Sequence, residues 1–390
     1  MSAEAGALAA ASRRAGWTSV AADLLSLTKP RITLMVLVTS AAGYLLGARS
    51  TAGAPGLLEA LIGIALVCGG TSALNQVLER DVDARMARTR RRPLPDGRLS
   101  PAVAMAFSLA LAAGGVLYLA VAVNLLTAAL GALALIVYDF AYTPLKRVGS
   151  LAILVGAVPG ALPAVGGWSA ATGELGPGAI TLFAILFLWQ LPHFLALGWL
   201  YREDYRRAGL RTLSVADPCG ARTGRQAVSY SLALLPVSLI PAVLGLGGAV
   251  YALGAVALGT AYLTSALRFA LQADVRRARG LFRASLVYLP ALLLLLTFDP
   301  GAGSAVAASV AGAGELLACP GCIQGSSPEL SQGFFWGMVL LMAAPAFLLV
   351  VIGGGLVHTY RRAMREEVER LLEEAVGETG RALRAREDAP

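Results

Sequence analysis

Long apolar runs alternate with short, mostly basic polar stretches along almost the whole chain. A helix that crosses a bilayer needs about 20 apolar residues, and runs close to this length recur throughout the sequence. The predicted spans are 32–48, 56–77, 101–121, 123–141, 150–171, 178–200, 227–247, 249–267, 281–298 and 334–357. The short alternating strands of a transmembrane barrel are not visible in this pattern. The fold class predicted is therefore all-α, a polytopic transmembrane helical bundle.

Composition agrees with this prediction. Hydrophobic residues make up 57% of the 390 residues and charged residues only 14%, whereas soluble domains are about 25% charged. The net charge of +8 does not indicate nucleic-acid binding, because basic residues in a membrane protein set its topology. The first 30 residues are mixed in polarity and show no evident cleavage site, so we expect no signal peptide.

The basic residues also predict an orientation. With the N-terminus in the cytoplasm, all of the 32 Lys and Arg residues except Arg49 fall in cytoplasmic segments. A bias this strong supports both the number of spans and their direction. The ten spans then return the C-terminal tail to the cytoplasm, and we expect the protein in the cytoplasmic (inner) membrane.

Five segments follow from this topology. The predicted order is a cytoplasmic N-terminal segment 1–31, a transmembrane domain 32–298, an external loop 299–333, an additional span 334–357 and a charged cytoplasmic tail 358–390. The loop contains Cys319 and Cys322 in a C-x-x-C. This pair could form a local disulfide, a redox pair or half of a metal site, or have no function, and a disulfide or no function is the interpretation we prefer.

The first loop with a chemical pattern follows the second span. Asn75, Glu79 and Asp83 are spaced i, i+4, i+8, which places them on one face of a helix. An amide oxygen and two carboxylates suit magnesium, which proteins usually hold with one or two carboxylates and substrate phosphates. Asp81 falls roughly on the opposite face, and we expect it either to pair with Arg85 or Arg88 or to lie behind the metal ligands without contacting the metal.

Arginines crowd the same loop directly after the acids, at positions 85, 88 and 90–92. Guanidinium groups bind phosphate oxygens in a bidentate manner. Acids that hold a metal beside bases that hold an anion are what a diphosphate site requires. The alternative is a solvated loop whose arginines only enforce topology, and spacing alone leaves both open.

Two further cytoplasmic segments carry candidate residues. Glu203 and Asp204 lie at the same membrane level as the first loop, and they could bind a second metal ion or complete the first site. His193 precedes them by about two turns, within a span, where an ionisable group is a functional candidate by default. The alternative for His193 is a neutral imidazole that hydrogen-bonds between helices.

The segment between the two acidic loops ends in Lys146 and Arg147, two more candidate diphosphate ligands. Tyr142 could steady a cation with the face of its ring. Topological anchoring and interfacial packing explain any one of these residues equally well.

Four stretches together carry a resemblance to a known family. They are the loop Asn75–Pro95, the motif Tyr142-Thr-Pro-Leu-Lys-Arg147, the segment Gly156–Pro163 with Trp168, and the segment Trp189–Gly209. Over roughly residues 25–298 the chain resembles the UbiA superfamily of intramembrane prenyltransferases, and within it the haem-farnesylating branch.

The resemblance implies nine spans around a central cavity, magnesium (Mg2+) as cofactor, and farnesyl diphosphate and haem B as substrates. The product would be haem O, and haem A synthase or terminal oxidase assembly factors would be partners. The metal ligands implied are Asn75, Glu79, Asp83, Glu203 and Asp204. The substrate-binding residues expected are Arg88, Arg92, Tyr142, Lys146, Arg147, His193 and Arg202. Many bacterial relatives have Asp where this chain has Glu79, which puts the metal geometry in doubt.

Two rival functions remain at this point. One is a UbiA-type transferase with a quinone precursor or another tetrapyrrole as acceptor. The other is a haem-handling membrane transporter without catalysis, which predicts more ionisable groups near the bilayer midplane. The acids of this sequence gather instead at one membrane surface, which favours chemistry on a phosphate.

Overall fold

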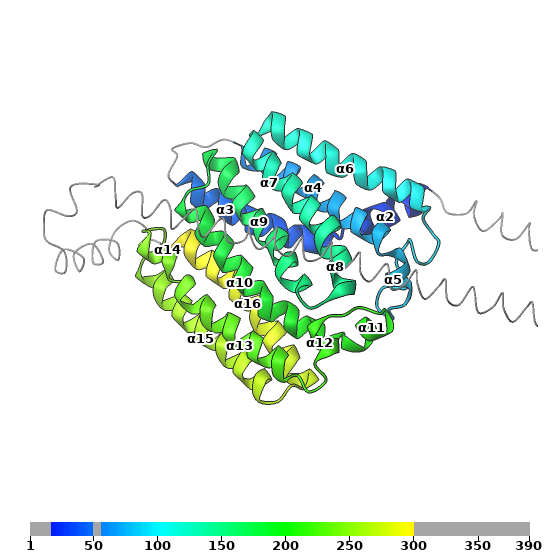
Figure 1. The fold of residues 1–390 in the computed structure, drawn as a ribbon. Coiled ribbons are helices and arrows are strands. Elements are labelled where there is room, and N and C mark those ends of the chain that lie inside the picture. The colour runs from blue at the N-terminus through cyan, green and yellow to red at the C-terminus, as the bar shows by residue number, and fades with distance from the viewer. Residues whose placement is uncertain (1–16, 50–55, 300–390) are drawn as a thin grey trace, which may run out of the picture. The chain divides into compact units, whose positions relative to one another are not determined.

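The computed structural model describes residues 17–49 and 56–299, and among them no strand occurs. Its elements are, in chain order, α2 (Trp17–Leu27), α3 (Pro30–Ala48), α4 (Leu57–Leu78), α5 (Arg80–Ala84), α6 (Pro101–Ala122), α7 (Leu125–Ile136), the π-helix η1 (Val137–Tyr142), α8 (Thr143–Val148), α9 (Ala152–Thr172), α10 (Pro177–Leu200), α11 (Arg202–Arg207), α12 (Leu213–Ala216), α13 (Ala221–Val237), α14 (Ile240–Val243), α15 (Ala249–Leu271) and α16 (Val275–Phe298) (Figure 1).

Nine helical segments in this part of the chain are long and apolar enough to cross a membrane. They match the first nine predicted spans, so the all-α transmembrane class is confirmed and the protein is a multi-pass membrane protein. Outward-facing side chains such as Val121 and Leu271 are more than 80% exposed, as expected where lipid rather than water surrounds the bundle. The tenth predicted span, the C-x-x-C loop and the tail lie outside the described residues.

Two spans begin six residues earlier than hydropathy predicts, at Ala221 and at Val275. Their first turns carry arginines, which the apolar pattern assigns to loops. Arginine is nevertheless a good helix former, and in α16 the side chain of Asp274 caps the helix by accepting a hydrogen bond from the backbone N–H of Arg277. These helices therefore extend past the apolar region into the polar boundary.

Small residues let the helices approach closely. A Cβ atom added at Gly43 of α3 would collide with the backbone of Ala164 on α9, and one added at Gly167 would collide with Ser40. Gly70 makes the equivalent close approach of α4 to Ala112 of α6. Membrane helices associate through such close backbone packing. On the other side of the bundle, larger buried side chains including Ile185, Tyr262 and Leu292 fill the space between α10, α15 and α16.

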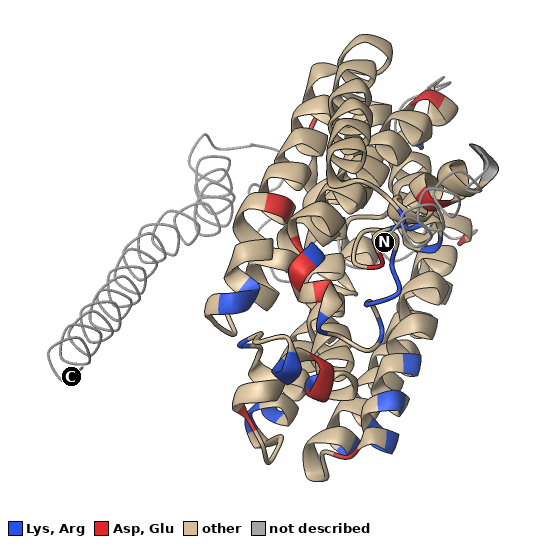
Figure 2. Ribbon diagram, turned by 90° about the vertical axis from the view of Figure 1, so that its right-hand side faces the viewer, with Lys and Arg blue, Asp and Glu red and all other residues tan. Residues whose placement is uncertain are grey.

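The basic residues gather at one end of the bundle (Figure 2). The short helices α5, α11 and α12 lie at the helix ends there (Figure 1). Val82 and Met86 of the first loop pack on Ala208 and Leu210 of the second loop in one buried cluster. The two acidic loops are therefore joined, although more than 100 residues separate them in the sequence.

Candidate active site

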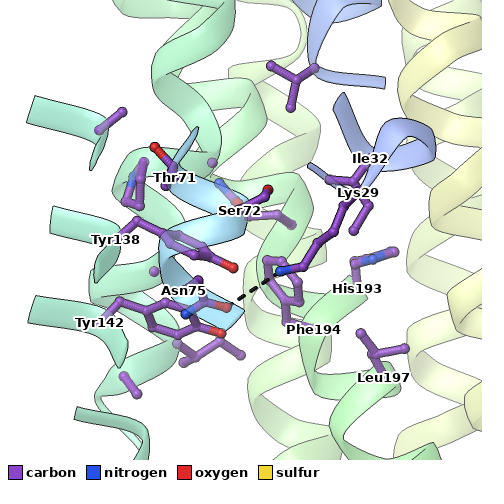
Figure 3. A pocket seen from close by; sticks show the side chains of 18 of the residues that line it. Lys29, Ile32, Thr71, Ser72, Asn75, Tyr138, Tyr142, His193, Phe194 and Leu197 are labelled. Carbon is purple, nitrogen blue, oxygen red and sulfur yellow. Dashed lines mark hydrogen bonds between the residues drawn. The ribbon is translucent and has the colours of Figure 1, made fainter. Parts of the chain in front are cut away.

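A cavity of about 710 Å³ opens between the joined loops and runs into the bundle. Side chains from α3, α4, α7, η1, α9, α10 and α16 line it (Figure 3). Along α4 the lining passes from Asn75 through Cys68 to Ile64, a distance of about 16 Å at a rise of 1.5 Å per residue. The cavity thus joins a charged end to an apolar interior.

The predicted acidic row is present at the charged end, although the helix that carries it is interrupted. Helix α4 ends at Leu78 and α5 begins at Arg80. The backbone N–H of Glu79 still bonds to the carbonyl of Asn75 at 2.9 Å, and that of Asp83 to Glu79 at 2.8 Å. This continued i→i−4 pattern keeps all three residues on one face, and all three line the cavity.

Asp81 lies outside the cavity, as its phasing predicted. Its side chain is 77% exposed and pairs with Arg80 at 3.2 Å. The predicted pairing with Arg85 or Arg88 was wrong, because the side chain of the adjacent Arg80 reaches it first on the solvated side of this short helix.

Each polar member of the acidic row has a partner from another segment. Lys146 Nζ lies 2.7 Å from Glu79 Oε1, and Arg92 lies 2.6 Å from Asp83 Oδ2. Asn75 donates to Thr143 Oγ1 at 2.8 Å. Within the described chain no three His, Cys, Asp or Glu side chains gather into a ready-made metal cluster. The acids are thus balanced by bases that also face the cavity.

Lys29, between α2 and α3, is a cavity residue that the sequence analysis missed. Its Nζ lies 3.5 Å from Asn75 Oδ1 (Figure 3). Burial, followed by the positive charges of Arg92 and Lys146, lowers the pKa of Lys29 to about 8. Glu79 and Asp83 offset this lowering only in part, so an incoming anion would stabilise the ammonium group further.

One sequence signal could have found Lys29. The chain contains 30 arginines but only two lysines, Lys29 and Lys146, and both line the cavity. Every other basic residue that could set the topology is an arginine. Lys29 also adopts a left-handed backbone conformation, φ 49°, which is uncommon for a residue other than glycine and often marks a functional position.

The π-helix η1 places a second row of residues opposite the acidic row. Tyr138, Tyr142 and Lys146 are spaced i, i+4, i+8, like the acidic row, and all three reach the cavity. Lys146 Nζ lies 4.6 Å from the centre of the Tyr142 ring. The cation that Tyr142 contacts in the structure is therefore Lys146, and its role toward a substrate cation stays a prediction. Gly156 leaves the space that the Tyr142 ring occupies.

The remaining predicted residues divide into two groups. Arg88 and Arg92 line the cavity, and Arg88 stacks 4.9 Å from the ring centre of Tyr201. Those that do not line it are Arg147, Arg202, Glu203 and Asp204. Arg147 is exposed, and Arg202 stacks on Trp199 at 4.4 Å.

The second acidic pair faces away from the cavity. The Glu203 side chain is 60% exposed and pairs with Arg206 at 2.8 Å. Asp204 accepts a hydrogen bond from the backbone N–H of Ala87 at 3.3 Å and pairs with Arg207. Although desolvation opposes it, these hydrogen bonds lower the pKa of Asp204. In this arrangement Asp204 ties the second loop to the first, and metal binding by this pair stays a prediction.

His193 hydrogen-bonds between helices and also lines the cavity, and a functional role for it stays a prediction. It lines the cavity, and its Nδ1 lies 2.7 Å from Ser285 Oγ on α16. Three aromatic rings, Trp189, Phe194 and Phe282, contact the imidazole. Helix α10 continues through Pro192, so His193 lies on a regular helix. There it contacts α16 and faces the cavity.

Comparisons with known proteins agree with this architecture. The model of the UbiA prenyltransferase family matches residues 36–289. The chain is 46% identical over 289 residues to the protoheme IX farnesyltransferase of Solibacter usitatus (strain Ellin6076), covering 72% of this chain and 99% of that protein. It is 46% identical over 283 residues to the protoheme IX farnesyltransferase of Myxococcus xanthus (strain DK1622), covering 72% and 95%.

Solved structures share the fold at low sequence identity. A structure of digeranylgeranylglyceryl phosphate synthase has a TM-score of 0.60 at 16% identity and covers 73% of this chain and 98% of its own. A UbiA homolog from Archaeoglobus fulgidus bound to GPP and Mg2+ has a TM-score of 0.51 at 17% identity, covering 70% and 99%. These structures establish the fold alone. The family match over most of the nine-span bundle, together with relatives that are covered almost end to end, shows that this chain belongs to the UbiA prenyltransferase family.

Proposed function

We propose that this enzyme transfers a farnesyl group from farnesyl diphosphate to a vinyl group of haem B and so makes haem O. The observation that carries the proposal is the single cavity that joins a charged end to an apolar interior. The names of the relatives, protoheme IX farnesyltransferases that this chain covers almost completely, support the donor and the acceptor.

The charged end suits a diphosphate. Five basic residues of the described chain line the cavity, Lys29, Arg31, Arg88, Arg92 and Lys146. Two of them, Lys146 and Arg92, are paired with Glu79 and Asp83, and phosphate oxygens would offer these bases alternative charge-assisted hydrogen bonds. Binding of the diphosphate would then free the two carboxylates.

The freed carboxylates fit a magnesium ion. Glu79, Asp83 and the amide oxygen of Asn75 line the same side of the cavity, and magnesium needs only one or two carboxylates when substrate phosphates complete its shell. Bound there, magnesium would neutralise the charge that develops on the departing diphosphate. Glu203 and Asp204 could bind a metal ion only after the second loop rearranges, because neither residue lines the cavity in this structure.

The apolar interior suits the prenyl chain. Ile64, Val67, Leu119 and Leu130 line it, and none of these four side chains carries a group that could react with an allylic cation. Closure around the chain would exclude water until the new carbon–carbon bond has formed. Water would then add to the cation left on the former vinyl group and lose a proton, which supplies the hydroxyl of haem O, while diphosphate is the leaving group. The ring faces of Tyr138 and Tyr142 lie between this interior and the diphosphate end, where they would stabilise the positive charge.

Both substrates of the proposed reaction are apolar enough to arrive from the membrane. Ile32, Met35 and Leu286 line the cavity and are each at least half exposed on the lipid-facing surface. We place the protein in the inner membrane with the charged end of the cavity on the cytoplasmic side, because the basic residues gather at that end (Figure 2). Haem A synthase or terminal oxidase assembly factors would receive the product.

An acceptor competition tests this proposal against the other UbiA-type transferases. Membranes that contain the protein receive farnesyl diphosphate, magnesium, haem B and an aromatic quinone precursor in equal amounts. We expect farnesylation of haem alone. Farnesylation of the quinone precursor would overturn the choice of acceptor, and a haem-handling transporter would modify neither compound.

A further inference from the structure

The hydrogen bonds around His193 determine which of its ring nitrogens carries the proton. Ser285 Oγ lies 2.6 Å from the carbonyl oxygen of Phe282 and 2.7 Å from His193 Nδ1. A carbonyl can only accept, and the serine hydroxyl has a single proton. Ser285 therefore donates to Phe282 and accepts from His193, so Nδ1 is the protonated nitrogen and Nε2 carries a free lone pair.

The imidazole is held in one orientation. Trp189 stacks on it with ring centres 5.3 Å apart and an interplanar angle of 28°, and the Phe282 ring lies 4.8 Å away. Trp189 is itself fixed, because its indole N–H donates to the Ser285 carbonyl at 2.8 Å and its carbonyl accepts from Tyr262 at 3.0 Å. Three helices, α10, α15 and α16, thus determine the plane of the His193 ring.

Nε2, the other ring nitrogen of His193, is available to bind a ligand in the cavity. His193 lines the cavity, and in the described part of the chain Nε2 makes no hydrogen bond and is not sealed from solvent. The two carboxylates of the described cavity lining, Glu79 and Asp83, pair with Lys146 and Arg92. No carboxylate in the described cavity lining competes for a ligand at Nε2.

We infer that His193 Nε2 coordinates the iron of the tetrapyrrole acceptor. This inference rests on the proposed function and names the group that orients its acceptor. Histidines that bind a metal through one nitrogen usually donate the other N–H to an oxygen acceptor, which is the arrangement of His193 and Ser285. The Nε2 lone pair forms the bond to iron, the Nδ1 proton stays on the Ser285 hydrogen bond, and no electron is transferred.

Coordination at His193 would position the reacting edge of the macrocycle. Figure 3 places His193 across the cavity from Tyr138 and Tyr142, the residues assigned above to the allylic cation. A macrocycle anchored at its centre by Nε2 extends its rim toward these tyrosines. The rings of Trp189 and Phe282 lie at 28° and 31° to the imidazole plane, so their edges would face the macrocycle beside the iron.

Binding measured without farnesyl diphosphate separates this inference from the reaction. The purified full-length protein is titrated with haem B and with metal-free protoporphyrin IX, which differ only in the iron. We expect the wild type to bind haem B at least 10-fold more tightly and to show the absorption spectrum of a histidine-ligated haem. In His193→Phe we expect the two affinities to become equal.

Two further variants distinguish the loss of an iron ligand from misfolding of the protein. His193→Gly should lose the spectrum and regain it when free imidazole is added, which a misfolded protein would not do. Phe187→Leu alters an aromatic side chain on the same helix that does not line the cavity, and it should keep the preference for haem B. Equal affinities in the wild type, or an unchanged preference and spectrum in His193→Phe, would overturn the inference.

The outcome is independent of the proposed reaction. Ligation of haem by a protein that makes no haem O would reject the proposed function and leave the iron ligand in place. Production of haem O by a His193→Phe variant with unchanged haem binding would overturn the iron ligand and leave the proposed function in place. Loss of turnover in His193→Phe with unchanged haem binding would overturn ligation and indicate a role in proton transfer.

Discussion

Lys146 and Glu79 form an ion pair of 2.7 Å across the charged end of the cavity, and the ring of Tyr142 covers the same ammonium group. The lysine side chain is 16% exposed and the glutamate side chain 12% exposed. A pair that is this well shielded holds one member of the proposed metal site and one member of the proposed phosphate site in contact. Substrate binding would have to divide the pair between a metal ion and a phosphate.

The first prediction concerns this lysine. Lys146→Gln should raise the KM for farnesyl diphosphate at least 10-fold, because it removes a charge-assisted hydrogen bond to phosphate and leaves Glu79 unpaired in a shielded site. Arg147→Gln is the matched control, since Arg147 is the next residue, has the same charge and is exposed. Steady-state kinetics compare the two, and an equal effect of both substitutions would refute the assignment.

The acidic row gives the second prediction. Glu79→Gln and Asp83→Asn should each lower kcat more than 100-fold, because each removes an ionised oxygen ligand from the proposed magnesium site. Asp81→Asn should stay within twofold of the wild type, since Asp81 points away from the cavity. Magnesium titrations at saturating farnesyl diphosphate provide the measurement. Retained turnover in both row variants, with the protein inserted normally, would remove the metal role.

Lys29 allows binding to be separated from stability. Its left-handed backbone costs roughly 1 kcal/mol or more for a residue other than glycine, so Lys29→Gly should relieve strain while removing the ammonium group. We expect the thermal midpoint of this variant to be no lower than that of the wild type, with the KM for farnesyl diphosphate raised about 10-fold. A large drop in the midpoint with an unchanged KM would show that Lys29 acts structurally.

Gly156 tests the position of Tyr142. A Cβ atom at Gly156 would lie 2.7 Å from the Tyr142 ring, so Gly156→Ala should displace the ring and lower kcat at least 10-fold. Gly114→Ala is the control, because nothing lies within 4 Å of a Cβ atom there. Alanine replaces glycine in a helix at a gain of roughly 0.5–1 kcal/mol, so the control should be active and slightly more stable. Normal turnover in Gly156→Ala would contradict a role for the tyrosine ring.

The last prediction concerns the second acidic pair, because Glu203 is exposed whereas Asp204 contacts the backbone of the first loop. Glu203→Gln should change turnover less than twofold, because this carboxylate is exposed. Asp204→Asn should lower turnover several-fold, because it weakens the contact with Ala87 that joins the two loops. If both substitutions instead abolish turnover and raise the magnesium requirement, the pair binds metal in the working enzyme and the second loop rearranges.

Sequence patterns predicted the fold and the acidic row because both depend on periodicity. The nine spans follow from runs of apolar residues, and the face shared by Asn75, Glu79 and Asp83 follows from helical spacing that survives the break at Glu79. The residues that escaped prediction depend on long-range packing. Lys29 reaches Asn75 from 46 positions away, and nothing in the local sequence indicates that approach.

Local spacing also could not determine the direction in which the second loop turns its side chains. Glu203 and Asp204 share the membrane level of the first acidic row, as their position after a span predicts. Their orientation is set by Arg206, Arg207 and the backbone of Ala87. Tyr138 also escaped prediction, although it has the same i, i+4, i+8 spacing with Tyr142 and Lys146 as the acidic row has, and all three residues line the cavity.

The haem product of the purified protein tests the central claim most directly. The protein in lipid nanodiscs is supplied with haem B, farnesyl diphosphate and magnesium, and the extracted haem is identified by mass spectrometry. We predict haem O, with the mass of haem B increased by one farnesyl group and one hydroxyl group, and its loss when magnesium is chelated. Unmodified haem B, recovered while a known farnesyltransferase is active under the same conditions, would contradict the account.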